Sequence, residues 1–229
     1  MNRQRIRLWD LPTRLFHWLL VLAVVASVVT GQLGGKLIDL HGKIGLAIVG
    51  LIAFRIVWGF AGSTYARFAQ FFPTPGKIKS YLNGEWRGLG HNPLGALSVF
   101  GLIFLLTAQT LSGLFANDDI AFVGPLYDLI SKSLSNRLSG LHELLSNVLI
   151  ALVVLHVAAI AFYSHVKKDK LIKPMLTGWK EGATGESAKG GGVLALIVAL
   201  TIAGTAIYGA SGAWLPEPPL PQTMETPSW

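Results

Sequence analysis

The chain has 229 residues, of which 52% are hydrophobic and only 14% are charged, and its formal net charge is +7. A soluble domain of this size is normally about 25% charged, so the composition indicates an integral membrane protein. The sequence contains no cysteine, which excludes disulfides, iron–sulfur clusters and every other site built on thiolates. The basic residues flank long apolar blocks, so membrane topology explains the charge better than nucleic-acid binding does.

Five apolar blocks are long enough to form membrane-spanning helices, and they predict an all-α membrane protein. They cover residues 15–33, 44–61, 93–116, 144–164 and 193–214. Residues 1–14 form a basic, amphipathic lead. The first block is long for a signal peptide and lacks a suitably placed cleavage site, so we expect it to be retained. The loop before the fourth block is expected to contain a short amphipathic helix around residues 126–134.

Lysine and arginine are distributed unevenly between the two sides that these spans define. The N-terminus and the second and fourth loops carry fourteen of them, whereas the first and third loops and the tail carry four. Because such residues concentrate on the cytoplasmic side of a membrane, we predict a multi-pass protein whose N-terminus is cytoplasmic and whose C-terminus lies outside.

Two histidines lie on one face of the fourth predicted span. His142 and His156 are fourteen residues apart, which corresponds to roughly 1400° of helical rotation, about 40° short of a whole number of turns. The rise between them is roughly 21 Å, which is most of the hydrocarbon thickness. One helix thus offers a ligand at two depths, as the axial ligands of two stacked haems require. For either histidine alone, a hydrogen bond to a neighbouring helix is an equally good explanation.

The predicted orientation pairs these histidines with two others. His41 stands just before the second span, near the outer side, at the depth of His142. His17 lies in the first turn of the first block near the cytoplasmic side, closer to the depth of His156. Two imidazoles that clamp one iron leave no open position for a substrate, so each pair suits electron transfer. Zinc is a poor alternative because each depth supplies only two ligands.

Cationic residues near each pair are candidate partners for haem propionates. Arg14 and Arg55 are placed for the cytoplasmic haem, and Lys43 is placed for the periplasmic one. Interfacial anchoring explains Arg14 and Lys43 equally well, whereas Arg55 lies inside its helix and needs a specific partner. Glycines could admit a flat macrocycle or simply allow close helix packing. These glycines are Gly42, Gly45, Gly50, Gly101 and Gly113.

Two histidines have no partner at depth. His91, in G-H-N-P-L-G, could cap the start of the third helix or line a quinone pocket, and capping or interfacial placement is favoured. His165 lies beside Lys167 and is expected to be interfacial, with a role near a quinone as the alternative.

The chain resembles the bacterial cytochrome b561 family, which includes the cytochrome b subunits of nickel–iron hydrogenases. The resemblance covers roughly residues 5–180. It depends on the motifs W-D-L-P-T-R-L-F-H-W, H-G-K-I-G, F-R-I-V-W-G and G-H-N-P-L-G together with His142 and His156. It implies a four-helix transmembrane bundle with two b-type haems, which passes electrons between the quinone pool and a periplasmic redox partner. The implied axial pairs are His17 with His156 and His41 with His142.

These observations predict a di-haem domain over residues 1–180, a Gly-rich linker over 181–192, a fifth transmembrane helix over 193–214 and a Pro-rich periplasmic tail over 215–229. The expected function is electron relay between quinone and a periplasmic cytochrome c, dehydrogenase or hydrogenase. An electron-transfer subunit is favoured over a complete enzyme. One alternative is a superoxide:quinone oxidoreductase of the same fold, although the mildly acidic outer loops do not favour an anionic substrate. The other is a haem-free transporter or assembly factor.

Overall fold

A computed structural model describes residues 5–120, 122–182 and 185–216 of the chain. Within these residues, five helices are long and apolar enough to cross a membrane. They are α1 (Leu11–Leu33), α2 (Ile38–Ala61), α5 (Pro93–Leu114), α6 (Lys132–His165) and α8 (Val193–Ala210). The protein is therefore an all-α, multi-pass membrane protein, which confirms the predicted fold class.

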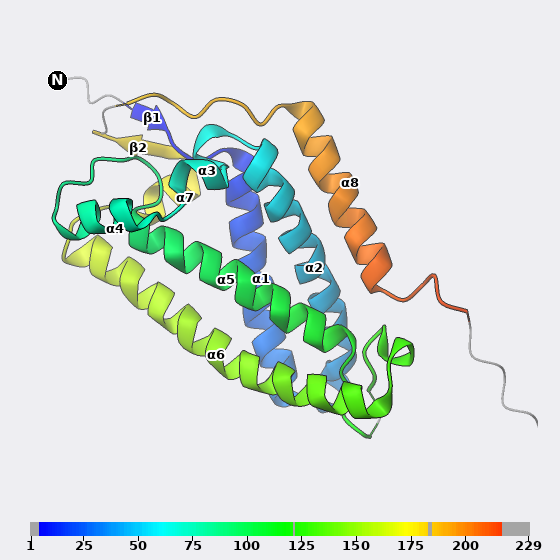
Figure 1. The fold of residues 1–229 in the computed structure, drawn as a ribbon. Coiled ribbons are helices and arrows are strands. Elements are labelled where there is room, and N and C mark those ends of the chain that lie inside the picture. Colours follow the sequence, from blue (N-terminus) through cyan, green and yellow to red (C-terminus); the bar gives the residue numbers. More distant parts are fainter. Residues whose placement is uncertain (1–4, 121, 183–184, 217–229) are drawn as a thin grey trace, which may run out of the picture.

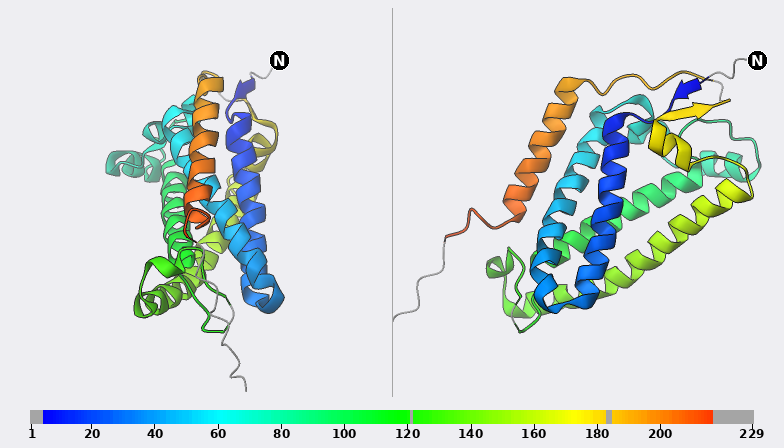
Figure 2. Two further views of the ribbon diagram at one scale, coloured as in Figure 1. Left: turned by 90° about the vertical axis from the view of Figure 1, so that its right-hand side faces the viewer. Right: turned by 180° about the vertical axis from the view of Figure 1, so that it is seen from behind.

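The long helices form two antiparallel pairs and one added helix (Figure 1). Helices α1 and α2 make the first pair, and α5 and α6 make a second pair that is inclined to the first (Figure 2). Helix α8 packs along α2. The N-terminus of α1 and the C-terminus of α6 lie at one end of the bundle, which we call the strand end. The α1–α2 turn and the α5–α6 loop lie at the other end, which we call the turn end.

Short elements connect the long helices. The helical ones are η1 (Gly35–Leu37), η2 (Thr64–Ala66), α3 (Phe68–Phe71), α4 (Pro75–Leu82), η3 (Tyr127–Leu129) and α7 (Ile172–Thr177). The extended ones are β1 (Arg5–Arg7) and β2 (Trp179–Glu181), which pair in an antiparallel sheet. These strands give the strand end its name, and the sequence did not predict them.

Side-chain caps fix where the long helices begin. Asp10 accepts a hydrogen bond from the backbone N–H of Thr13 at 2.7 Å and so starts α1. The other oxygen of Asp10 accepts from the indole N–H of the fully buried Trp58, at 3.0 Å, which ties the start of α1 to the end of α2. Asn92 caps α5 in the same way through the N–H of Gly95, at 2.7 Å.

Two helices begin earlier than the apolar blocks do. Helix α2 starts at Ile38, so His41 lies in its first turns. Helix α6 starts at Lys132, because Ser131 accepts from the N–H of Leu134 and caps the helix there. The amphipathic helix predicted around residues 126–134 is wrong: residues 127–129 form one 3₁₀ turn, and the later residues belong to α6.

The segment that follows α7 fastens the N-terminal strand to the rest of the bundle. The N–H of Leu8 donates to the carbonyl of Gly178 at 2.8 Å, and the N–H of Ala188 donates to the carbonyl of Arg7 at 2.7 Å. The N–H of Thr64 donates to the carbonyl of Lys189, also at 2.8 Å. We call residues 178–182 and 185–190 the strap. The described part of the predicted Gly-rich linker is therefore hydrogen-bonded to two other segments.

The buried core is divided along the membrane normal. At the strand end, Phe16, Phe54 and Trp58 pack with Ala199 and Ala203 of α8. The middle of the bundle holds an aliphatic cluster from three helices, which comprises Ile48, Ile52, Leu105, Leu106 and Leu149. A smaller cluster of Leu114, Leu126 and Ala210 lies at the turn end. Helix α8 contributes to both end clusters, so it packs as an integral part of the bundle.

Candidate functional site

The structure brings His41 and His142 together at the turn end. Their ring centroids are 6.0 Å apart and the ring planes are nearly perpendicular, at 89°. Two imidazoles on opposite sides of one metal ion, with metal–nitrogen distances of about 2 Å, have centroids roughly 6 Å apart. Both histidines line a cavity of about 470 Å³ between α1, α2, α5 and α6, which is within the usual size range of cofactor sites.

Backbone carbonyls orient both of these rings. Nδ1 of His41 donates to the carbonyl of Ser27 at 2.9 Å, and Nδ1 of His142 donates to the carbonyl of Gln109, also at 2.9 Å. A carbonyl can only accept, so the proton of each neutral imidazole lies on Nδ1 and leaves Nε2 as the metal-binding atom. The amide nitrogen of Gln109 lies 3.1 Å from Nε2 of His142, and the amide oxygen of Gln109 is buried without a partner.

Two glycines give the rings room to approach the backbone. A Cβ on Gly113 would lie 2.7 Å from Cε1 of His142, and a Cβ on Gly31 would lie 3.0 Å from Cε1 of His41. The contact at Gly113 is closer than a Cβ atom comes to other atoms, and the contact at Gly31 is tight enough that the ring of His41 would have to shift by a few tenths of an ångström. Among the glycines predicted to admit a macrocycle, Gly113 therefore has a clear local function, whereas Gly50 serves close packing against Ile207 of α8.

His17 and His156 lie toward the strand end, on α1 and α6. The hydroxyl of Ser98, on α5, lies 3.2 Å from Nδ1 of His156. His17 packs edge-on against Trp18, with ring centroids 5.3 Å apart. The structure places His17 and His156, which the sequence analysis paired by depth, on the same side of the middle aliphatic cluster.

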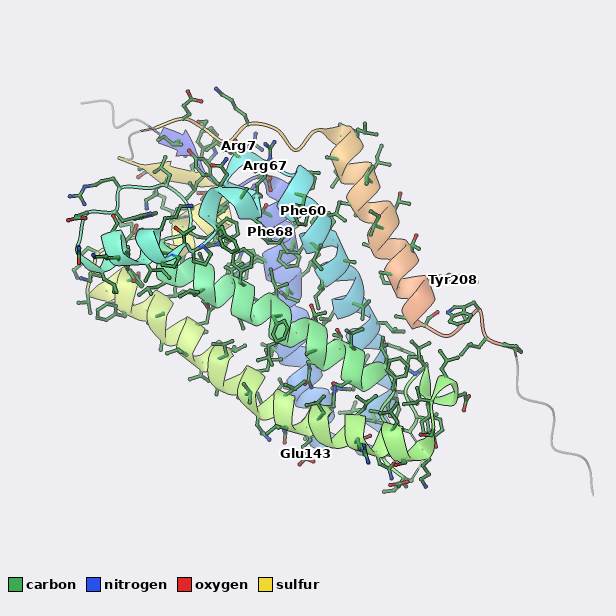
Figure 3. All side chains as sticks on the ribbon, viewed as in Figure 1. Arg7, Phe60, Arg67, Phe68, Glu143 and Tyr208 are labelled. Atoms are coloured by element: carbon green, nitrogen blue, oxygen red, sulfur yellow. The ribbon has the colours of Figure 1, made fainter. Side chains whose placement is uncertain are left out.

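Arg55 is buried near this second pair, with only 3% of its surface exposed. Its guanidinium lies over the ring of Phe68, 4.6 Å from the centroid, and one of its terminal nitrogens, Nη1, has no hydrogen-bond partner among the described residues. Figure 3 shows Phe68 at the opposite end of the bundle from Glu143, which follows His142. A buried guanidinium with a free donor fits an anionic group such as a haem propionate.

The other two predicted cations have different surroundings. Arg14 donates from Nη1 to the carbonyl of Leu176 in α7, and its Nε is buried without a described partner. Arg14 therefore holds α7 against α1 whatever else it binds. Lys43 is exposed and is not among the residues that line the cavity at the turn end.

His91 packs between Trp9 and Phe71, with ring centroids 4.8 and 4.5 Å away, and its Nδ1 is buried without a described partner. Burial, together with the smaller effects of the nearby Arg55, His17 and His156, lowers the pKa of His91 to about 3. The predicted capping role is wrong, because Asn92 caps α5.

His165 is exposed at the end of α6, as expected, and its Nδ1 donates to the carbonyl of Ala161.

A comparison of the sequence with known families now identifies the protein family. The prokaryotic cytochrome b561 family matches residues 8–178, which contain all four paired histidines. The chain belongs to this family. It is a membrane cytochrome of b type that transfers electrons, and a cytochrome of this type binds haem b.

Curated relatives carry a consistent description. A probable Ni/Fe-hydrogenase B-type cytochrome subunit from Azotobacter chroococcum mcd 1 is 27% identical over 76% of this chain and 88% of its own length. The corresponding Rhodobacter capsulatus protein is 24% identical over 77% of this chain and 82% of its own length. The probable Ni/Fe-hydrogenase 1 B-type cytochrome subunit of Escherichia coli (strain K12) is 25% identical over 46% of this chain and 57% of its own length. No solved structure matches the chain.

The chemistry of the donors fits the cofactor of this cytochrome family. Each end of the bundle offers two imidazole nitrogen donors, and described residues at both ends leave buried polar atoms without partners. The sequence analysis missed Ser27, Ser98, Gln109 and Ser112, which surround the histidines. Such small polar residues are common in membrane helices, so only their contacts reveal them.

Proposed function

We propose that this cytochrome holds two b haems, one between His17 and His156 and one between His41 and His142, and relays electrons across the membrane. The observation that carries the proposal is the pair at the turn end. Its rings are 6.0 Å apart, both donate from Nδ1 to backbone carbonyls, and both face one cavity. A haem ligated on both faces supplies one-electron transfer without a position for substrate binding.

The histidines and their neighbours keep each proposed haem in place and in a low-dielectric environment. The middle cluster of Ile48, Ile52, Leu105, Leu106 and Leu149 separates the two ends and excludes water between them. Buried charge is costly in such surroundings unless it is paired, and Arg55 would supply that pairing for a propionate. Arg14 and Lys43 are the proposed additional partners at the strand end and the turn end.

We infer that quinone exchanges electrons at the strand end. A cavity of about 240 Å³ is lined there by Phe71, Trp86 and His91, among others, so it offers aromatic surfaces and an imidazole to a quinone head group. The loops of this end carry most of the lysine and arginine residues, so we assign it to the cytoplasmic side of a bacterial inner membrane. The turn end and the C-terminus are then periplasmic.

The redox partner is proposed to be periplasmic. Relatives of this chain are described as subunits of Ni/Fe-hydrogenases, which supports a hydrogenase, and a cytochrome c or another dehydrogenase fits the same position. The predicted domain limits remain part of the proposal: a cytochrome domain over residues 1–180, a linker over 181–192, a fifth span over 193–214 and a tail over 215–229. Most of that tail, residues 217–229, lies outside the described residues.

Haem counting in histidine variants tests the proposal. The purified protein should contain about two b haems per chain by the pyridine haemochrome method. His142→Ala and His156→Ala should each lose mainly one haem, and redox titration should show that the two variants lose different components. His165→Ala is the matched control on the same helix and should keep both. Retention of two haems in both ligand variants would contradict the proposed pairs.

The two alternative functions make different predictions. A superoxide:quinone oxidoreductase would reduce quinone steadily with superoxide and without a protein partner. The outer surface does not favour that substrate, because Lys132 is engaged in an ion pair with Asp119 at 2.8 Å. A haem-free transporter or assembly factor would be colourless when purified from haem-replete cells, and membership of a cytochrome family argues against it.

A further inference from the structure

Helix α5 contributes no histidine to either proposed haem, yet it contacts His142 and His156, the two proposed ligands on α6. Ser112 lies 3.3 Å from Nδ1 of His142, and Ser98 lies 3.2 Å from Nδ1 of His156. The two serines are fourteen residues apart, as the two histidines are, and α5 and α6 run antiparallel. The two helices are therefore in register, with one serine beside each histidine.

The two contacts are not equivalent. His142 donates from Nδ1 to the carbonyl of Gln109 at 2.9 Å, so the Ser112 hydroxyl is a second and longer partner of the same atom. For His156, Ser98 is the only hydrogen-bond partner among the described residues. His17, on the opposite side of the same proposed haem, has no such partner in that part of the chain.

Glycine explains why α5 orients its two neighbours differently. Gly113 lets the ring of His142 approach the α5 backbone closely enough to reach a carbonyl. The position fourteen residues earlier is Val99, which carries a branched side chain. His156 therefore relies on a side-chain hydroxyl that can be removed by substitution, whereas His142 relies on a carbonyl that cannot.

We propose that Ser98 is the positioning residue of His156: its hydroxyl accepts the Nδ1 proton, directs Nε2 toward the iron, and thereby sets the reduction potential and the retention of the haem at the strand end. This inference rests on the proposed role of His156 as an axial ligand. Hydrogen bonds to the second nitrogen of a ligating histidine fix its tautomer and orientation and raise its basicity. A more basic ligand stabilises the oxidised iron, so the bond to Ser98 lowers the reduction potential.

The test compares Ser98→Ala with Ser98→Thr and with Ser112→Ala in the purified full-length protein. Loss of the hydroxyl in Ser98→Ala should raise the midpoint potential of one haem component only. It should also weaken binding of that haem by about 10- to 100-fold, measured as haem transfer to apomyoglobin. Ser98→Thr keeps a hydroxyl and should behave like the natural protein in both measurements. Ser112→Ala should shift the potential of the other component less than Ser98→Ala shifts its own, because the Gln109 carbonyl remains.

Three results would overturn the inference, and they can be told apart. If His156→Ala removes one haem while Ser98→Ala leaves the potential and affinity of that haem unchanged, Ser98 has no positioning role and the proposed ligands stand. If His156→Ala retains both haems, the ligand assignment fails and the role of Ser98 fails with it. Equal shifts of the midpoint potential in Ser98→Ala and Ser98→Thr would indicate an effect of side-chain packing and would also contradict the inference.

Discussion

The two ends of this bundle hold their histidines by different means. At the turn end, both rings donate to backbone carbonyls and lie against glycines, so the geometry is fixed by the helices themselves. At the strand end, a serine hydroxyl contacts one ring, and the buried Arg55 and His91 lie nearby with unpartnered polar atoms. One site is thus built by backbone packing and the other by side-chain chemistry. Substitutions should therefore act sterically at the first and electrostatically at the second.

The largest effect is expected from Gly113→Ala at the turn end. The new Cβ would lie 2.7 Å from the ring of His142, so either the ring or α5 must shift. Overpacking of this kind costs about 1–3 kcal/mol, and here it would displace a proposed ligand. We expect loss of one haem component in the reduced-minus-oxidised spectrum while the other persists.

Gly101→Ala is the matched control for that steric prediction. Its new Cβ would meet only Leu152, at 3.8 Å, which is ordinary contact. This variant should keep both haems and should be as stable as the natural protein. Loss of haem in both glycine variants would mean that α5 tolerates no substitution at either glycine. The effect of Gly113→Ala could then no longer be attributed to the contact with His142.

His91 makes the stability of the strand end depend on pH. Its pKa is about 3 in the folded protein and 6.5 ordinarily, so between these values the unfolded state binds a proton that the folded state excludes. Stability is therefore full above pH 6.5 and falls as the pH drops, by up to about 2 kcal/mol at pH 5. His91→Gln should flatten this part of the pH profile of thermal unfolding in detergent. An unchanged slope would show that other groups control it.

Arg55→Leu should change the midpoint potential of the haem at the strand end and leave that of the haem at the turn end unchanged. Removal of a buried positive charge stabilises the oxidised haem, so the midpoint potential of that component should fall. For a charge roughly 10 Å away the effect is on the order of 1–2 kcal/mol. Arg55→Lys keeps the charge and should recover most of the potential. A fall in the midpoint potentials of both haem components would indicate that the substitution disturbs the packing of the whole bundle.

The smallest effect is expected from Lys43→Gln at the turn end. Lys43 is exposed, so solvent and salt screen its charge, and the change in potential should be below about 0.5 kcal/mol. A shift as large as that of Arg55→Leu would show that Lys43 pairs with a propionate much more strongly than its exposure implies. It would also show that the turn end depends on side-chain charge as well.

Much of this organisation was predictable from the sequence, because membrane helices have strong signals. Apolar blocks gave the five spans, and loop charges together with helical depth paired His41 with His142. Their 6.0 Å separation agrees with that pairing. The ligand roles remain a prediction that haem counting must test.

The remainder depends on contacts that no local pattern encodes. Strand β1 has only three residues and pairs with a segment far along the chain, so neither strand has a periodic signal of its own. The cap on α5 was assigned to His91 instead of the adjacent Asn92. The matching fourteen-residue spacing of Ser98 and Ser112 was present in the sequence. It acquires meaning only once α5 and α6 are known to be antiparallel neighbours.

The strap also bears on how the protein is assembled during synthesis. The N–H of Arg7 donates to the hydroxyl of Ser187, which lies 180 residues later in the chain. The N-terminal segment leaves the ribosome first, yet its partners emerge only after α6 has been made. Closure of the strand end is therefore a late event in translation, and α1 must wait in the membrane with an unpaired β1. Completion of the strap would mark a chain whose first four spans have already been inserted.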